Sequence, residues 1–242
     1  FKRQFGRPGT GPGDLGRPMN ITVAGGELYV AEYWNDRIQV FGLDGIHRRY
    51  VGRKGSRPGA FNAPGGIAVS PAGDLFVADF YNQRVQRLKA DGSFVGQWGT
   101  TGETGIGAGS FNYPTDVAIG SDGTLYVADG YNDRVQAFAA DGRFLRKWGG
   151  PFAVNVHGPF AGWFATVTAL AVDAAGNVLA ADFYNNRVQK FAPDGTFLTA
   201  FGGEGKGRLR HAMGVAAAAD GAVFVTDFDN NRITKWRPSD DR

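Results

Sequence analysis

Five segments of the sequence repeat a carboxylate, an asparagine and an arginine at fixed spacing. In each segment Asn follows the carboxylate by three positions, Arg follows it by five, and Val or Ile comes directly after Arg. A carboxylate at this distance can pair with the arginine across a turn, and asparagine stabilises left-handed turn backbone. A set that recurs in every unit is expected to hold each unit together rather than to form one active site. The set consists of Glu32, Asn35, Arg37, Asp79, Asn82, Arg84, Asp129, Asn132, Arg134, Asp182, Asn185, Arg187, Asp227, Asn230 and Arg232.

Side chains typical of catalytic or metal centres are scarce. The chain has no cysteine, which excludes a thiolate metal site and a cysteine nucleophile. Its three histidines are His47, His157 and His211, and none has a second ligand at the spacing that metal motifs use. We therefore predict no catalytic residue, no metal site and no cofactor, and we expect that the protein is not an enzyme.

The repeated segments belong to a tandem array of β units. Their arginines are 47, 50, 53 and 45 residues apart. In the second unit the expected strands are residues 66–70, 75–78, 84–89 and 94–99, separated by turn sequences. Many of the 38 glycines lie at such turns. Four short antiparallel strands in a unit of about 45 residues are typical of a β-propeller blade. Residues 1–242 are therefore predicted to form a single all-β propeller domain with five four-stranded antiparallel blades.

The two ends of the sequence indicate how the ring could close. Outer strands have the form aromatic, three residues, aromatic, glycine at residues 94–99, 144–149 and 197–202. No such strand follows Trp236, but residues 1–6 fit the same form. We expect the N-terminal strand to complete the C-terminal blade, which would leave no open sheet edge. A sixth blade in residues outside this sequence is the alternative.

The five segments, with the Asp-Gly turns that follow them, resemble the NHL repeat, and the resemblance covers about the whole chain. It implies a β-propeller, most often six-bladed, that serves mainly as a binding platform. Similar proteins include RNA-binding translational regulators, extracellular sensor domains of bacterial kinases and a peptide-amidating lyase. The axial metal-binding histidines of that lyase are not visible here. The residues that enter the expected axis-lining strands are too small and apolar for a metal-binding carboxylate cluster: Asn20, Gly66, Asp116, Ala169 and Gly214.

Three features depart from the repeat or add to it, and they are the candidate binding surfaces. Aromatic residues in the turns could stack on a base, a sugar ring or an apolar side chain, or they could pack between blades. A basic group suits an acidic protein, anionic lipid or phosphate, or it forms a solvated rim. An apolar insertion at residues 150–164 would plug the channel or meet a partner. The candidates are Tyr33, Trp34, Phe80, Tyr81, Tyr131, Phe183 and Tyr184 in the turns, Arg48, Arg49, Arg53, Lys54 and Arg57 in the basic group, and Trp163 and Phe164 in the insertion.

These features predict a non-catalytic binding or scaffold propeller that docks another protein through its loops. A propeller that binds single-stranded RNA is the first alternative, although a net charge of +3 gives it little support. A propeller lyase or hydrolase with a metal in the central channel is the second. No apolar run is long enough to span a membrane, and peripheral membrane contact through the basic group stays open. The lack of cysteine and of an initiator Met favours an exported bacterial protein, periplasmic or extracellular, with a cytoplasmic one as the alternative.

Overall fold

The computed structural model of the chain describes residues 4–205 and 207–237. These residues form five antiparallel sheets, which we call blades one to five in chain order. Blade one contains β1 (Pro18–Ala24), β2 (Glu27–Glu32), β3 (Arg37–Gly42) and β4 (His47–Val51), and blade two contains β5 (Pro64–Val69), β6 (Leu75–Asp79), β7 (Arg84–Leu88) and β8 (Phe94–Trp98).

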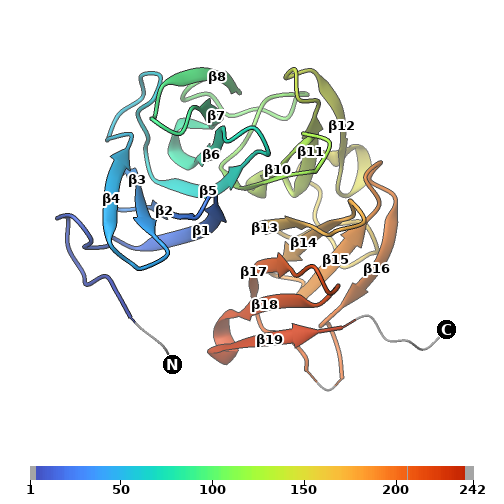
Figure 1. The fold of residues 1–242 in the computed structure, drawn as a ribbon. Helices are drawn as coiled ribbons and strands as arrows, with labels where there is room; N and C mark the ends of the chain where they lie inside the picture. Colours follow the sequence, from blue (N-terminus) through green and yellow to red (C-terminus); the bar gives the residue numbers. More distant parts are fainter. Residues whose placement is uncertain (1–3, 206, 238–242) are drawn as a thin grey trace.

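The other three blades repeat this order with one difference at the end. Blade three contains β9 (Pro114–Ile119), β10 (Leu125–Asp129), β11 (Arg134–Phe138) and β12 (Phe144–Trp148), and blade four contains β13 (Val167–Val172), β14 (Val178–Asp182), β15 (Arg187–Phe191) and β16 (Phe197–Phe201). Blade five has three strands in the described residues, β17 (Ala212–Ala217), β18 (Val223–Asp227) and β19 (Arg232–Trp236). The blades follow one another around a centre, with the first strand of each blade innermost (Figure 1). The prediction of an all-β propeller with five blades is confirmed.

Each blade buries one face against the next blade. Between blades one and two, Ile38 and Val40 pack with Phe61, Ile67 and Val77, and none of the five is more than 3% exposed. Equivalent clusters fill the other three junctions. Burying one such aliphatic or aromatic side chain stabilises the fold by about 1.5–3 kcal/mol. In blades one to four the second and third strands are therefore buried on both faces, which explains apolar runs such as Leu125–Ala128.

One face of the ring is built from the turns between second and third strands and from the loops between blades. Short 3-10 turns stand at three of these positions: η1 (Phe80–Asn82), η2 (Gly130–Asn132) and η4 (Phe228–Asn230). They lie beside the loops, because the backbone N–H groups of Tyr81 and Tyr131 donate to the carbonyls of Asn62 and Asn112 at 3.1 Å. We call this surface the turn face. A further short 3-10 turn, η3 (Pro151–Ala153), lies in the insertion.

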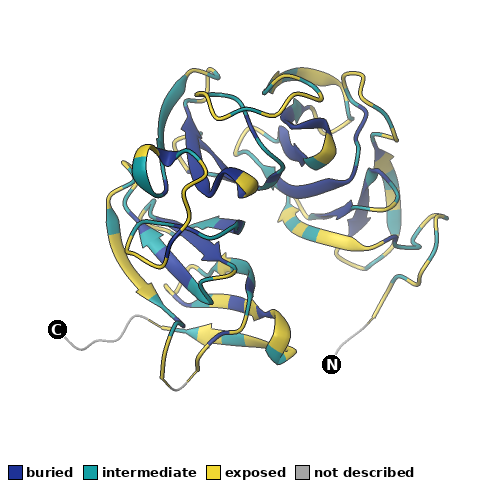
Figure 2. Cartoon of the chain, turned by 180° about the vertical axis from the view of Figure 1, so that it is seen from behind, coloured by how far each residue is buried: buried dark blue, intermediate teal, exposed yellow. Residues whose placement is uncertain are grey.

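The expected closure by the N-terminal strand is not observed. Gln4, Phe5, Gly6 and Arg7 are outside any strand, and Phe1–Arg3 lie outside the described residues. Within the described chain, β19 pairs only with β18, and an opening separates blade five from blade one (Figure 1). The strands that border this opening are largely exposed, whereas the inner strands of blades two and three are buried (Figure 2). Among the described residues, no helix combines the length and apolar character that crossing a membrane requires.

Candidate functional site

The repeated carboxylate, asparagine and arginine form one hydrogen-bonded network in every blade. In blade two, Asp79 Oδ1 accepts the N–H of Asn62 at 2.7 Å, and Oδ2 accepts Asn82 Nδ2 at 2.9 Å and Arg84 Nε at 2.8 Å. The same contacts recur in the other four blades. Arg84 is 1% exposed and Asp79 is fully buried. These groups satisfy one another and hold the turn, so they leave little capacity to bind a ligand.

Burial also sets the charge state of these carboxyl groups. Removal from water raises the pKa of Asp79, Asp129 and Asp182 above the ordinary value, against the hydrogen bonds from asparagine, arginine and backbone that lower it. A raised pKa in this setting reports tight packing around the turn. The turns are therefore rigid supports for the side chains that project from them.

The residue between Asn and Arg of each repeat joins one blade to the next. Asp133 has φ 51°, and its Oδ1 accepts the backbone N–H of Thr166 in the next blade at 2.7 Å. In the same way, Asn186 Oδ1 accepts the backbone N–H of His211 at 2.8 Å. The two donor residues, Thr166 and His211, also have positive φ. The equivalent bonds run from Ala63 to Asp36 and from Tyr113 to Gln83. We call these four bonds the junction bonds. The junction bonds are not among the predictions from the sequence, although an acceptor side chain stands at each of these four positions: Asp36, Gln83, Asp133 and Asn186.

Aromatic side chains form a continuous belt over the first three blades of the turn face. We define the aromatic belt as Tyr33, Phe80, Tyr81, Tyr113 and Tyr131. Ring centroids are 6.0 Å apart for Tyr33 and Phe80, and 4.9 Å apart for Phe80 and Tyr113 and for Tyr113 and Tyr131. The hydroxyls of Tyr33 and Tyr81 are 3.0 Å apart, and burial together with this hydrogen bond raises the pKa of Tyr33 to about 12.

The two aromatic positions of each turn differ in exposure. The residue next to the carboxylate is half-buried at Tyr33, Phe80 and Phe183. The following residue is exposed, at 69% for Trp34 and 47% for Tyr81. Tyr131 and Tyr184 are also exposed, at 52% and 63%. The first position therefore packs between neighbouring turns, and the second position faces solvent.

A separate aromatic group lies between blades four and five. His211 stacks on Phe183 with ring centroids 4.4 Å apart, and Tyr184 meets its edge at 5.7 Å. His211 Nδ1 lies 2.7 Å from Asp229 Oδ2. Asp229 follows His211 by 18 residues, so only the fold brings the two side chains together.

The predicted basic group is divided between two places. Arg48 and Arg49 lie on β4, where Arg48 pairs with Asp44 at 3.0 Å and Arg49 makes two bonds to Glu27 at 2.6 and 2.7 Å. Their charges are therefore largely neutralised.

The rest of the basic group lies on the loop from blade one to blade two. Arg53, Lys54 and Arg57 are exposed there and line a groove of about 560 Å³. Lys54 Nζ is 3.6 Å from Asp36 Oδ2.

The two insertion residues, Trp163 and Phe164, differ in burial. Phe164 is fully buried, and its ring lies 5.4 Å from that of Phe191. It occupies the position that Phe61 and Phe111 hold at the earlier junctions, and it belongs to the core rather than to an exposed surface. Trp163 is half-buried against Phe160 at 5.0 Å.

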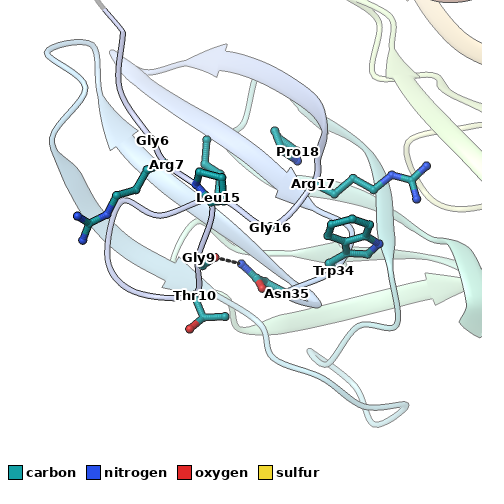
Figure 3. Close-up of a pocket in the computed structure, with 11 residues that line it drawn as sticks. Gly6, Arg7, Gly9, Thr10, Leu15, Gly16, Arg17, Pro18, Trp34 and Asn35 are labelled. Atoms are coloured by element: carbon teal, nitrogen blue, oxygen red, sulfur yellow. Dashed lines mark hydrogen bonds between the residues drawn. The ribbon is translucent and has the colours of Figure 1, made fainter.

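A pocket of about 520 Å³ lies on blade one beside the belt. Arg17, Trp34, Leu15 and Thr10 are among its lining residues, and Asn35 Nδ2 donates to the Gly9 carbonyl at 2.9 Å on its floor (Figure 3). The Arg17 guanidinium is 5.0 Å from the Tyr33 ring centre and 5.6 Å from that of Trp34. Such cation–π contacts join a positive charge to the end of the belt.

Asp116 occupies the axis of the ring. Its Oδ1 accepts Asn20 Nδ2 at 3.0 Å and the Val117 N–H at 2.8 Å, and its Oδ2 accepts the Leu170 N–H at 2.8 Å. Burial raises the pKa of Asp116 to about 7, against the lowering effect of the two backbone hydrogen bonds. A Cβ at Gly66 would stand 2.0 Å from Oδ1. The carboxyl group therefore ties blades one, three and four together in a space that only glycine leaves free.

The described part of the chain holds no cluster of three or more histidine, cysteine or acidic residues suited to a metal ion.

The NHL repeat matches residues 61–88, 111–138 and 164–191. These ranges contain the second and third strands and the carboxylate networks of blades two, three and four. No curated protein matches the sequence significantly.

Several solved structures share the fold at low sequence identity. A catalytically inactive histidine-to-alanine form of virginiamycin B lyase from Staphylococcus aureus, with quinupristin, has a TM-score of 0.64 at 17% identity, covering 97% of this chain and 73% of that one. A protein of unknown function from Bacteroides caccae has 0.63 at 12% identity, covering 87% and 70%. The WD40 propeller domain of Doa1 has 0.65 at 11% identity, covering 91% and 63%. Identities this low carry the fold alone, and together with the repeat match they lead to one conclusion: the chain contains NHL repeats and folds as a β-propeller.

Proposed function

We propose that the chain is a non-catalytic platform that docks another protein through its turn face. The observation that carries this proposal is the row of exposed aromatic residues at the second turn position. Trp34, Tyr81, Tyr131 and Tyr184 stand at equivalent places on four successive blades, and each is at least 47% exposed. Tyrosine and tryptophan are the residues that most often anchor protein interfaces.

The support beneath these residues suits a binding role. Trp34, Tyr81 and Tyr184 each follow a half-buried residue, and Tyr131 follows the buried Gly130, all on turns held by the carboxylate network. The turns are also linked between blades by the junction bonds. Because the turns are ordered before binding, little conformational entropy is lost when a partner docks.

Charge on the turn face favours a protein over RNA. Lys54 Nζ lies 3.6 Å from Asp36 Oδ2. Asp229 is exposed on blade five. Carboxylates interleaved with cations oppose a phosphate backbone, which requires a continuous basic path. Arg17 beside Trp34 suits an acidic group next to an apolar side chain of the partner.

Site-specific photo-crosslinking in the source cells tests the proposal. We would replace Tyr81 or Tyr131 by p-benzoylphenylalanine and use Leu198, which is 47% exposed on the outer strand β16, as the matched control position. A protease-sensitive, nuclease-resistant adduct is expected from the two turn positions only. Combining Trp34→Ala, Tyr81→Ala and Tyr131→Ala should weaken binding of the identified partner by about tenfold or more.

Two outcomes would contradict the proposal. Equal adducts from Leu198 and Tyr81 would show that the turn face has no preference for the partner. A nuclease-sensitive adduct, with affinity for single-stranded RNA that falls steeply with salt, would support the RNA alternative instead.

A second candidate function is acid–base chemistry at His211. The specific observation is its 2.7 Å contact with Asp229, which can fix the ring tautomer as an orienting carboxylate does in catalytic dyads. Phe183 and Tyr184 would supply an apolar wall. Hydrolytic or lyase turnover lost in both His211→Gln and Asp229→Asn, while Tyr131→Ala keeps it, would support this reading over the platform.

A further inference from the structure

The loop from blade one to blade two carries three exposed cations. Arg53, Lys54 and Arg57 line the groove of about 560 Å³, which we call the basic groove. Among the described residues, Arg53 and Arg57 form no ion pair, and Lys54 Nζ lies 3.6 Å from one carboxylate, that of Asp36. Neighbouring like charges repel one another, so a groove of this kind favours an anionic occupant.

The repeat shows that the fold of this loop does not require the cations. In the loop from blade one to blade two, the Gly55 N–H donates to the Phe61 carbonyl at 2.8 Å. In the loop from blade two to blade three, the Gly105 N–H donates to the Phe111 carbonyl at 3.0 Å. At the positions of the three cations the second loop has Glu103, Thr104 and Gly107. The same backbone therefore forms without them, and a role in binding explains their presence better than a role in folding.

The backbone of the loop is held by hydrogen bonds that do not involve its arginine side chains. The Arg57 carbonyl accepts the Ala60 N–H at 3.0 Å and Arg84 Nη2 at 3.1 Å. The Arg53 carbonyl accepts the Phe61 N–H at 2.8 Å. The side chains of Arg53 and Arg57 can therefore be replaced without removing a contact that holds the loop.

The lining of the basic groove carries charges of both signs. The loop supplies the three cations, and the turn between β7 and β8 supplies Asp91 and Gly92. Tyr50 also lines the groove, and the Arg37 guanidinium is 4.0 Å from its ring centre. A compact dianion such as phosphate would meet Asp91 as well as the cations. An extended peptide can instead direct carboxylates to the loop and backbone N–H groups to Asp91, so the charge pattern suits a peptide better.

The basic groove adjoins the turn that presents Tyr81. Asn82 Nδ2 donates to the Gly55 carbonyl at 2.9 Å, and the Tyr81 N–H donates to the Asn62 carbonyl at 3.1 Å. Both hydrogen bonds join the turn of blade two to the loop that carries the cations. A partner that contacts the exposed aromatic row can therefore reach the groove with the same surface.

We propose that the basic groove binds an acidic segment of the protein that docks on the turn face. This inference rests on the proposed function and names the chemistry of the partner. The segment lies extended along the loop, with its carboxylates against Arg53, Lys54 and Arg57 and its backbone N–H groups toward Asp91. An apolar side chain next to the acidic residues contacts Tyr81.

Fluorescence anisotropy with two labelled probes tests the chemistry of the groove in the purified 242-residue chain. The probes are a short peptide of alternating glutamate and glycine and a short oligouridine. Arg57→Glu reverses a charge in the groove. Arg143→Glu is the control with the same change of charge, at an exposed position in the turn before β12. Thermal unfolding of both variants checks that the fold is kept.

The acidic peptide is expected to bind the unaltered chain, and its affinity should fall between about 50 and about 200 mM salt because salt screens exposed charges. Arg57→Glu should weaken this binding about fivefold or more, whereas Arg143→Glu should change it less than about twofold. The oligouridine is expected to bind more weakly than the peptide.

A further photo-crosslinking position identifies the bound segment in the source cells. Ser56, which is exposed in the groove, would be replaced by p-benzoylphenylalanine. Mass spectrometry of the adduct then maps the cross-linked residues of the partner. A segment with clustered aspartate and glutamate residues is expected.

Three results would overturn the proposal. In the first, Arg57→Glu and Arg143→Glu lose the same affinity for the peptide, so that only the net charge matters. In the second, the oligouridine binds more tightly than the peptide and loses affinity in Arg57→Glu, so that a phosphate backbone is the occupant. In the third, the Ser56 position cross-links to a segment without acidic residues. An adduct from Tyr81 in that third case leaves the docking function standing, and its absence while the peptide still binds in the groove contradicts the docking function alone.

Discussion

Blade two and blade five contain the same network, yet their surroundings make it a different structure in each. Arg84 is 1% exposed and makes five hydrogen bonds, to Asp79, Gln97, Thr101 and two carbonyls. Arg232 keeps the bond to Asp227 at 2.7 Å but is 46% exposed. The comparison shows that much of the burial of a repeat residue comes from the outer strand and loop that follow it, not from its own three inner strands.

The pKa values of the two carboxyl groups, Asp79 and Asp227, also differ between the two blades. Burial raises the pKa of Asp79 above the ordinary value. At Asp227 burial has the same direction, but the hydrogen bonds from the Arg210 N–H, Asn230 and Arg232 outweigh it, and the pKa lies below the ordinary value. In blade five a buried carboxylate therefore pairs with an arginine that water reaches, whereas in blade two both partners are buried, and solvent screening weakens the first pair.

Removing the arginine should give the largest difference in unfolding free energy between a variant of blade two and the matching variant of blade five. Arg84→Met leaves the Asp79 carboxylate buried without its cation, and we expect a loss of about 3–5 kcal/mol in the free energy of unfolding. Arg232→Met should cost less, because water reaches the position of Arg232 and can solvate the Asp227 carboxylate that the variant leaves unpaired. Denaturant unfolding of both variants measures the difference. Equal losses would mean that blade five is as well covered as blade two.

Asp116 on blade three contacts Asn20 of blade one and Leu170 of blade four. Its carboxyl group should make the stability of the fold depend on pH. Because the pKa of Asp116 rises to about 7 in the folded state, the folded state holds a proton that the unfolded state releases near pH 4. Stability should therefore fall as pH rises from about 4 to about 7 and level off above it, by roughly 2–4 kcal/mol in all. Asp116→Asn should abolish this part of the slope.

Two controls sharpen the pH prediction. Asp122→Asn should leave the fall between pH 4 and 7 nearly unchanged and should alter the profile only below about pH 4, because hydrogen bonds from Thr124 lower the pKa of Asp122 and its contribution to stability is lost only on acidification below that range. Gly66→Ala should lower stability at every pH, since the new Cβ would meet both Oδ1 and the Cα of Asp116, whereas Gly96→Ala, with open space around it, should be nearly neutral. A wild-type profile that rises between pH 4 and 7 would contradict the assignment.

The fold could be predicted because the pattern of each blade repeats five times. The alternation around Arg84, the apolar run of Leu125–Ala128 and the glycine at each turn all agree on the same four-stranded unit. The closure could not be predicted, because residues 1–6 satisfy the outer-strand pattern whichever blade they complete. Only the packing of Phe5 on Phe41 shows which neighbour the segment has.

The candidate site was predicted in its residue types but not in its exposure. Aromatic turn positions are visible in the sequence, but the division between half-buried Tyr33 and exposed Trp34 depends on the neighbouring turns. Phe164 was read as a loop residue, although it precedes its first strand by three positions, as the core residues Phe61 and Phe111 do. The sequence does not indicate that Arg49 forms an ion pair, because its partner Glu27 lies 22 residues away.

The junction bonds give the smallest and most specific test of the comparison between closed and open ends. Asn186 and Asn231 are the same residue type at equivalent positions, with φ of 56° and 49°. Asn186 Oδ1 accepts the His211 N–H at 2.8 Å, whereas among the described residues no blade follows Asn231. Glycine suits this backbone, so Asn186→Gly should cost about 1–2 kcal/mol through the lost bond alone. Asn231→Gly should change the free energy of unfolding by less than about 0.5 kcal/mol. If the two variants already cost the same in the 242-residue chain, the end of blade five is a closed junction.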